Sequence, residues 1–341
     1  MSGSFTFCRR EPAGAAVSQY LEKTLALPPG RFLVSGDVAT SVPNRDGVLW
    51  IHGNAAFFPR VCRRLLRMPA GERPLVVIWH MEPLPPPTAS GIPKPRLHLR
   101  EIAKIVLRDA RATDVYTNAF TLRRLHRNGV PDVLVVSAPG RQEYLAERGI
   151  PSHFVPVGLL PEAGRDLALE RDIDVLFLGS LDVPRRNRIL QSLRAQGVPV
   201  TALGDWKNPD YWGESRTILL NRAKILLNLS RTEGEYSGIR ILLGLANKAL
   251  VVSEPIYESK PYIPGRHFVM ARHEELAERI LHYLRDPVAR AAIVEEGYRA
   301  AHAEFAMERS LNRILRFLAE HRKKGGSLVR TALDSGRAEI R

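Results

Sequence analysis

The sequence predicts an α/β protein built from two doubly wound parallel sheets. Short apolar runs, each long enough for one buried strand, alternate along the chain with stretches of helical periodicity. This alternation stops over residues 158–172 and then starts again, which favours two separate sheets. We therefore predict domains over 1–160 and 161–310, followed by a helix and tail over 311–341. Whether that helix crosses back to the first domain stays open.

Length and composition limit the class of protein. A chain of 341 residues with 45% hydrophobic residues is long enough for two ordinary domains with sizeable cores. Two cysteines, Cys8 and Cys62, provide neither a disulfide framework nor a metal-ligand cluster, which fits a reducing cytoplasm. The sequence contains no apolar run of about 18 residues. Charged residues at 9–11 also interrupt the apolar core that a signal peptide needs. The expected location is cytoplasmic, with peripheral contact at the inner membrane face left open.

The first half contains six predicted strands. The strongest are GVLWI at 47–51 and PLVVIW at 74–79, and a polar loop follows each of them. A proline-rich run that ends at Pro95 excludes regular structure after the second loop. Residues 1–20 show no clear pattern. The predicted strands are 31–34, 47–51, 74–79, 114–118, 133–137 and 153–157, and the predicted helices are 57–66, 97–112, 119–127 and 142–148.

The second half contains five predicted strands. A Gly179-Ser180 loop follows the first of them, and Gly197 closes the next helix, as helix C-caps favour. A polar, aromatic loop is predicted over 205–215, and a frayed tail over 325–341. The predicted strands are 174–178, 198–203, 225–229, 249–252 and 267–270, and the predicted helices are 186–196, 216–222, 239–246, 273–285, 287–303 and 307–321.

The segment from Lys224 to Pro255 carries the first functional signal. It reads as strand, polar loop, helix and strand, which brings the loop to the carboxyl edge of a parallel sheet. Such edges bind nucleotides, and the N-terminus of the following helix favours phosphate. Arg240 lies in the first turn of this helix, where its charge opposes the helix dipole and no local partner is evident. A bound anion would stabilise Arg240, and a solvated surface position is the alternative.

Motifs and charge narrow the choice of ligand. The sequence contains no GxGxxG after a first strand, no GxxxxGK[ST] and no GxSxG, which argues against dinucleotide dehydrogenases, P-loop ATPases and α/β-hydrolases. The net charge of +14, from 50 basic and 36 acidic residues, favours an anionic partner such as a nucleotide phosphate or an acidic membrane. Basic residues are scattered, and HRKK at 321–324 is the one tight cluster near an end. A nucleic-acid partner is therefore not expected.

Three segments of the second half resemble the donor-binding domain of GT-B glycosyltransferases. The resemblance is closest to the family 1-like branch that includes the bacterial spore-maturation-type enzymes. The segments are DVLFLGSLDVPRRNRIL at 174–190, ILLNLSRTEGEYSGIRILLGLANKALVVSEP at 225–255 and YIPGRHFVMARHEELAERILHYLRDPVARAAI at 262–293. The first half fits an acceptor domain only in its alternation and in VPVG at 155–158. The resemblance implies two Rossmann-like domains that face a cleft.

The resemblance also implies how the donor is bound. In these enzymes, cationic side chains and backbone N–H groups commonly stabilise the leaving diphosphate without a metal ion, and an Arg fork suits phosphate oxygens. No tightly bound cofactor or metal is expected, and the co-substrate is a UDP-, GDP- or dTDP-sugar. Arg240 is expected to be catalytic as well as donor-binding. The expected donor-binding residues are Gly179, Ser180, Arg185, Arg186, Asn228, Ser230, Ser237, Gly238, Arg240 and Glu254, with Tyr262 and Gly265 at the border.

The acceptor is expected at the carboxyl-edge loops of the first half. His80 and Glu82 follow its strongest strand, and either could accept the proton of the acceptor hydroxyl. A hydrogen-bonded structural histidine and an ion-pairing glutamate are the alternatives. His52 and Asn54 lie in an analogous loop, and Trp79 could stack on a sugar, although tryptophans in strands usually belong to the core.

The sequence departs from the family at two positions. Many retaining GT-B enzymes carry a Glu, seven residues and a second Glu that holds the donor ribose. Glu235 could begin that motif here, but position 243 is Leu, and Lys248 replaces the small residue expected after the helix. Glu254 is a candidate replacement for the ribose contact, and a solvated residue after a strand is the alternative.

The predicted function is transfer of a sugar from a nucleotide-sugar to an acceptor hydroxyl, in glycan, glycolipid or natural-product biosynthesis. The expected partners are the donor and a glycan, lipid-linked or small-molecule acceptor, with contact to an anionic membrane as an option. Leu243 and Lys248 motivate one alternative, a GT-B-like nucleotide or glycan binding protein without catalysis. The basic charge alone motivates another, a nucleic-acid-binding protein.

Overall fold

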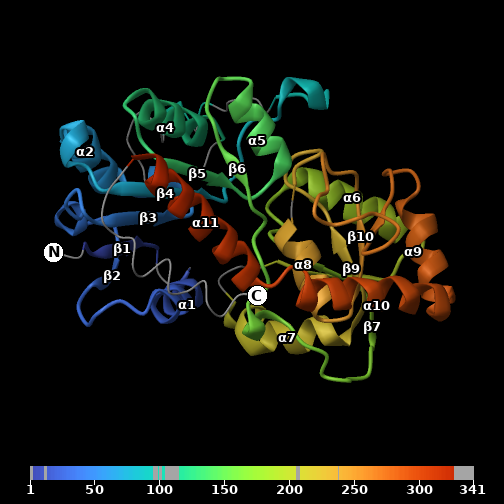
Figure 1. Cartoon of the computed structure of the whole chain (residues 1–341). Coiled ribbons are helices and arrows are strands. Elements are labelled where there is room, and N and C mark those ends of the chain that lie inside the picture. Colours follow the sequence, from blue (N-terminus) through green and yellow to red (C-terminus); the bar gives the residue numbers. More distant parts are fainter. Residues whose placement is uncertain are drawn as a thin grey trace. The chain divides into compact units, whose positions relative to one another are not determined.

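The computed structural model describes residues 3–10, 14–94, 99, 102–103, 115–204, 208–236 and 238–325. The chain forms two compact units, Met1–Val155 with Ser310–Arg341, and Pro156–Arg309 (Figure 1). Each unit has its own parallel sheet, which confirms the predicted α/β class with two doubly wound sheets. The helix predicted over 97–112 and the tail predicted over 325–341 lie almost entirely outside the described residues.

The first unit contains a six-stranded sheet in the order β2-β1-β3-β4-β5-β6, with every neighbouring pair parallel. Its strands are β1 (Phe5–Cys8), β2 (Phe32–Ser35), β3 (Val48–His52), β4 (Leu75–His80), β5 (Val133–Val136) and β6 (His153–Phe154). Its helices are α1 (Ala15–Leu25), α2 (Pro59–Arg67), α4 (Val115–Arg127) and α5 (Pro139–Ala146), together with most of α11 (Met307–Gly325).

Helices α2 and α4 pack on the same face of this sheet. Leu65 of α2 and Leu122 of α4 share an apolar cluster with Leu49 of β3 and Ile78 of β4. The strand order reverses beside β1, so right-handed connections place α1 on the opposite face from α2 and α4. Central strands are thereby buried on both faces, which explains why β3 and β4 read as continuous apolar runs.

Two elements of the first unit were not predicted, and one prediction is wrong. Residues 1–20 showed no pattern, yet they contain β1 and the start of α1, and β1 lies inside the sheet between β2 and β3. The predicted strand 114–118 belongs to helix α4 from Val115 onward. Contacts of Asn118 are part of the reason that this segment is helical and not a strand. Its side chain donates to the carbonyl oxygen of Pro83 and accepts from Asn54, and a local sequence pattern does not show such distant contacts.

The second unit contains a five-stranded parallel sheet in the order β11-β10-β9-β7-β8. Its strands are β7 (Ile173–Leu178), β8 (Val200–Leu203), β9 (Ala223–Asn228), β10 (Leu250–Ser253) and β11 (Val269–Met270). The chain passes from β7 outward to β8 and then returns to the other side of β7 as β9. This reversal creates a switch point at the carboxyl ends of β7 and β9, where open α/β sheets bind ligands.

Helices cover both faces of the second sheet (Figure 1). These helices are α6 (Pro184–Ala195), α7 (Gly213–Arg222), α8 (Gly238–Ala246), α9 (Leu276–Arg285) and α10 (Pro287–Ala303). Residues of α7, α8 and α10 share one apolar cluster, and residues of α6 and α9 share another. Within the described residues, none of the helices is both long and apolar enough to span a bilayer.

Candidate functional site

The candidate site lies at the switch point of the second sheet. Gly179 and Ser180 directly follow β7, while Asn228 ends β9 and leads to the buried Ser230. The loop after β9 continues into the first turn of α8, which contains Arg240. The structure therefore brings together at one sheet edge residues that are about 60 positions apart in the sequence.

Arg240 is held by uncharged acceptors rather than left in solvent. Its Nε donates to the carbonyl oxygen of Leu178 at 3.2 Å, and its Nη1 donates to Asn228 Oδ1 at 2.8 Å and to the Leu229 carbonyl at 3.1 Å. These contacts correct the expectation that Arg240 has no local partner. A Cβ at position 179 would lie 3.0 Å from Arg240 Nη2, so Gly179 permits the close approach of this guanidinium.

A second guanidinium lies beside that of Arg240. Arg186 is buried, and its Nε donates to the Leu229 carbonyl oxygen at 3.0 Å. Both guanidinium carbons lie 5.6 Å from the ring centre of Phe177. Burial, together with nearby arginine charges, lowers the pKa of Arg186 and of Arg240 to about 10 each. Two desolvated positive charges at one sheet edge form an arrangement that a bound anion would stabilise.

Arg185 has a different environment, because a buried carboxylate neutralises it. Its guanidinium forms a two-pronged ion pair with Glu254, whose side chain is fully buried. Glu254 also accepts from the backbone N–H of Ser230 at 2.5 Å and lies 3.2 Å from His273 Nε2. These contacts leave Glu254 bound to protein groups, so in this structure it anchors the loop after β9 and holds Arg185.

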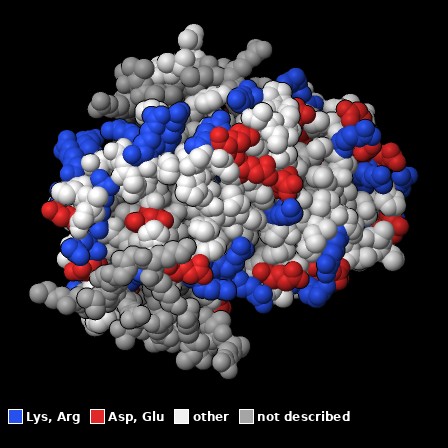
Figure 2. All heavy atoms as spheres, turned by 45° about the horizontal axis from the view of Figure 1, so that its top comes forward, with Lys and Arg blue, Asp and Glu red and all other residues white. Residues whose placement is uncertain are grey.

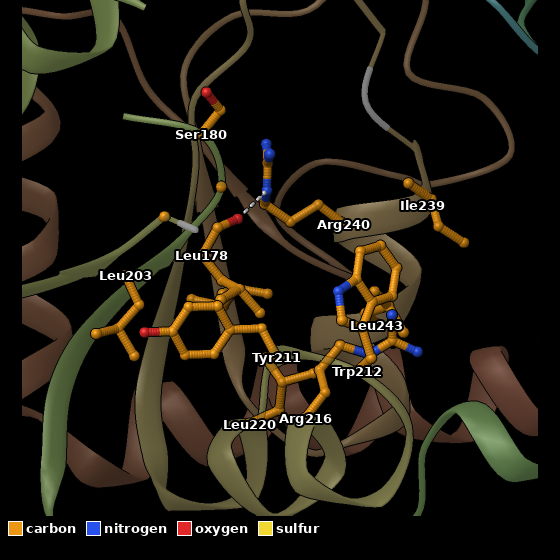
Figure 3. Close-up of a pocket in the computed structure, with 13 residues that line it drawn as sticks. Leu178, Ser180, Leu203, Tyr211, Trp212, Arg216, Leu220, Ile239, Arg240 and Leu243 are labelled. Carbon is orange, nitrogen blue, oxygen red and sulfur yellow. Dashed lines mark hydrogen bonds between the residues drawn. The ribbon is translucent and has the colours of Figure 1, made fainter. Parts of the chain in front are cut away.

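A cavity of about 260 Å³ opens beside Arg240 (Figure 3). Ser180 and Arg240 lie at its upper end in the figure, and Tyr211 and Arg216 lie at its lower end. The wall between them is mostly apolar. The lining residues are Leu178, Gly179, Ser180, Leu203, Gly204, Tyr211, Trp212, Arg216, Leu220, Leu226, Ile239, Arg240 and Leu243.

Sequence reasoning missed the aromatic end of this cavity. Tyr211, Trp212 and Arg216 come from a short 3₁₀ helix at Pro209–Tyr211 and from the start of α7. The sequence did contain a signal for these residues. The loop predicted over 205–215 is polar and aromatic, and the strand before it ends at the same sheet edge. Leu243 also lines the cavity. This is the position at which many retaining GT-B enzymes carry a ribose-binding Glu, and in this chain it contributes apolar surface.

The other expected donor residues lie close to this site. Asn228 and Ser230 are buried, and each bonds to protein: Asn228 Nδ2 donates to Ser253 Oγ at 2.9 Å, and Ser230 Oγ donates to the Glu235 carbonyl at 2.8 Å. Gly238 begins α8 against the Tyr236 ring, where a Cβ would come within 2.6 Å of the hydroxyl oxygen. Ser237 lies outside the described residues. Asn228 and Ser230 therefore position the loop rather than present free polar groups.

Lys248 has a structural role away from the cavity. It adopts a left-handed backbone conformation (φ 52°) just after α8, the helix C-cap position at which glycine is favoured. Its ammonium group pairs with Asp166 at 3.3 Å and with Glu295 at 2.8 Å. The lysine thus closes the helix and joins it to two other segments of the same unit.

In the first unit, His80 is completely buried at the end of β4. Both of its ring nitrogens are buried, and their one polar neighbour noted among the described residues is the backbone of Glu82. Burial, and then the charge of Arg141, lowers the pKa of His80 to about 3. A histidine with this pKa and no solvent access is a weak base, which argues against His80 as the group that receives the acceptor proton. Glu82, two residues on, is half-buried and remains the better-placed candidate.

The remaining expected acceptor residues belong largely to the packing of the first unit. His52 contacts the rings of Phe7 and Trp79, and burial lowers its pKa to about 4. Trp79 is completely buried, with its ring N–H donated to Val155. Asn54 is also buried and bonds to Asn118 and to the N–H of Ala56. Trp79 therefore belongs to the core, which was its alternative, and Asn54 is engaged by protein groups.

The buried His80 should make the protein sensitive to acid. Because its pKa is about 3 when folded and about 6.5 when unfolded, its neutral form is compatible with the fold above pH 6.5. Stability should then fall by about 1.4 kcal/mol per pH unit as pH drops from about 6.5 towards 3. Urea unfolding at several pH values should show this slope, and His80→Leu should make it shallower. Equal slopes for the two proteins would contradict the assignment.

Comparisons with known proteins agree with this architecture. A protein-family model described as "Glycosyl transferase-like" matches residues 185–316. The solved structure of WaaG, a glycosyltransferase involved in lipopolysaccharide biosynthesis, has a TM-score of 0.58 at 13% identity, covering 92% of this chain and 99% of that chain. Anabaena HepE in complex with UDP-glucose has a TM-score of 0.55 at 10% identity, covering 93% of this chain and 100% of that chain.

TarM extends the same comparison, with a TM-score of 0.56 at 11% identity. The match covers 88% of this chain but only 57% of TarM, so this chain spans little more than half of that protein. No curated protein matches the sequence. At these identities the structural likeness establishes the fold, and it confirms the predicted GT-B class.

Proposed function

Because residues 185–316 match a glycosyl transferase-like family model and the chain has the GT-B fold, we propose that it transfers a sugar from a nucleotide donor to an acceptor hydroxyl. The observation that carries this proposal is the convergence of Arg186 and Arg240 at the switch point of the second sheet. In glycosyl transfer the bond between the sugar and the diphosphate breaks, and the leaving diphosphate needs stabilisation. Paired guanidinium groups at a helix N-terminus are suited to that task.

We propose that the donor lies along the cavity wall. Its diphosphate would contact Arg240, Arg186 and the loop after β7, and its base would enter between the aromatic side chains at the far end (Figure 3). Pockets that enclose a drug-sized ligand have volumes of roughly 300–1,000 Å³. The cavity here, at about 260 Å³, is smaller and would enclose only part of the donor. The guanidinium groups would act in a metal-independent way, as positive charges fixed in place before the reaction.

The acceptor would be bound by the first unit, with Glu82 as the proposed general base. In the transfer step the acceptor oxygen forms a bond to the anomeric carbon, and the bond from that carbon to the diphosphate oxygen breaks. The hydroxyl proton passes to the carboxylate, and the electron pair stays with the diphosphate. A partly accessible carboxylate can receive the proton, whereas a buried histidine cannot reach it.

The donor class can be tested directly. We expect UDP, GDP or dTDP, each tried with its sugars, to raise the melting temperature as its concentration rises, since ligands that bind only the folded state stabilise it. CMP serves as a monophosphate comparison. Release of nucleotide from the matching sugar in the presence of acceptors would then establish turnover. The structure of HepE contains UDP-glucose, which makes UDP-sugars the first to try. No binding by any of the diphosphates would refute the proposal.

We further propose that the first unit makes peripheral contact with an anionic membrane. Helix α2 exposes four arginines spaced as one helical face, and α4 exposes three more, while neither helix contains an acidic residue. Both helices pack on the same side of the sheet, and in Figure 2 basic side chains gather on the left, where Figure 1 places α2 and α4. These residues are Arg60, Arg63, Arg64, Arg67, Arg123, Arg124 and Arg127.

Vesicle binding tests this contact. Each Lys or Arg near an anionic bilayer contributes about 1 kcal/mol, so changing the four α2 arginines to Gln should weaken binding to phosphatidylglycerol-containing vesicles by about 100-fold or more at low salt. The control changes four exposed arginines of the second unit, Arg188, Arg194, Arg279 and Arg285, to Gln. An equal loss in both variants would indicate attraction by net charge alone and would contradict the proposed surface.

A further inference from the structure

Arg216 is the charged residue at the aromatic end of the cavity. It lies in α7, with its guanidinium carbon 5.8 Å from the ring centre of Trp212, and Figure 3 shows the two side chains together at that end. Among the described residues the side chain of Arg216 makes no hydrogen bond or ion pair, and its Nε is buried without a partner. Arg222, on the same helix, is instead paired with Asp172 on the surface.

An unpaired guanidinium in an apolar wall is unfavourable without a ligand. Burial lowers the pKa of Arg216, which shows that the charged form loses solvation there. The group has five N–H donors and no acceptor, so a stabilising partner must present acceptor atoms. Around it stand Trp212, Leu220 and Leu243, which favour a flat, largely apolar ring over a compact anion.

We propose that Arg216 selects the base of the donor by donating to a ring carbonyl oxygen. This inference rests on the proposed function, because it assigns the nucleobase to the aromatic end of the cavity. Uracil, thymine and guanine carry a carbonyl oxygen on the edge away from the sugar, where cytosine and adenine carry an amino group. The donor is therefore a nucleotide-sugar with a carbonyl-bearing base.

The selectivity follows from the donor-only character of arginine. An amino group on the base would place N–H opposite N–H and leave the half-buried guanidinium without its acceptor. Sites built to hydrogen-bond one substrate reject analogues that lack the matching group, because the buried polar group of the protein is then unpaired. A good pairing of Arg with a base carbonyl is worth about 1–3 kcal/mol, a preference of about 5- to 150-fold.

The test compares UDP with CDP, which differ at that position of the ring. For the wild-type protein we expect UDP to bind at least about 10-fold more tightly than CDP in isothermal titration, and GDP more tightly than ADP. In Arg216→Gln the UDP preference should fall towards one, since an amide both donates and accepts and so fits either base. The control Arg222→Gln, on the same helix, should retain the wild-type preference.

The possible outcomes separate this inference from the proposed function. Equal wild-type affinity for UDP and CDP, or an unchanged preference in Arg216→Gln, would overturn the role of Arg216 while nucleotide binding itself stands. A parallel loss of UDP and CDP affinity in the variant would indicate a phosphate contact instead, and it would also overturn the inference. If Arg216→Gln does not fold, Arg216→Met provides the same comparison, and the wild-type ratio decides alone if neither folds. Absence of binding by all four nucleotides would refute the proposed function.

Discussion

Replacing Arg240 by Met should reduce turnover by about 100- to 1,000-fold, the usual effect of removing a group that stabilises developing negative charge. The guanidinium is fixed by the carbonyl oxygens of Leu178 and Leu229 and by Asn228, so it needs little rearrangement when the diphosphate leaves. Donor affinity should fall less than the turnover number, because charge on the diphosphate increases in the transition state. Steady-state kinetics with the donor found in the binding screen would measure both effects.

The control for this experiment is Arg279→Met, an exposed arginine of α9. Its turnover should match that of the wild type. Arg240 also ties β7, β9 and α8 together, so the melting temperature of each variant must be measured alongside the rate. Arg240→Lys retains a charge without the planar fork and should recover only part of the rate. Wild-type turnover in a folded Arg240→Met protein would remove Arg240 from the diphosphate site.

Glu254→Ala should destabilise the protein by about 3 kcal/mol or more, the usual result of breaking a buried ion pair by removing one partner. The Glu254 carboxylate is fully buried and receives hydrogen bonds from Arg185 and from the N–H of Ser230. Its loss leaves the Arg185 charge, which is 20% exposed, without its carboxylate, and it leaves the buried N–H of Ser230 without its acceptor. Urea unfolding at neutral pH would measure the change in the free energy of unfolding.

The pair of Arg222 and Asp172 provides a matched control. It has the same chemistry, but each side chain is 45% exposed, so Asp172→Ala should destabilise the protein far less than Glu254→Ala. The double change Arg185→Met with Glu254→Met should recover much of the stability, since well-packed apolar residues often replace buried ion pairs without loss. A similar cost for Glu254→Ala and Asp172→Ala would show that Glu254 is not an anchor.

Most of the fold could be predicted from local pattern. Strands such as β4 and β9 are continuous apolar runs that end in polar loops, because burial on both faces of a parallel sheet leaves no place for polar side chains. Local pattern was insufficient for β1, because Thr6 interrupts its apolar residues, although neighbours on both sides pair with it. The first turn of α4 was read as a strand because its hydrogen-bond partners are distant in sequence.

The candidate site was partly predictable for a similar reason. Gly179, Ser180, Arg186 and Arg240 were expected at one sheet edge, because the carboxyl ends of parallel strands meet there, and the structure places them together. The pairing of Arg185 with Glu254 had no sequence signal, since ion pairs across a sheet edge depend on side-chain directions. Arg216 was missed because only the folded cavity shows that this side chain is half-buried, with its Nε lacking a partner among the described residues.

By itself, the sequence determined the class of this protein: two parallel sheets, with most of their strands and helices in the correct order along the chain. These features follow from apolar period and loop chemistry, which are local properties of the chain. The tertiary structure decided which polar groups are available to a ligand. It paired Arg185 and Glu254 with each other, buried His80, and left Arg216 in an apolar wall. Such differences arise from solvent exclusion and three-dimensional contact, which no local pattern contains.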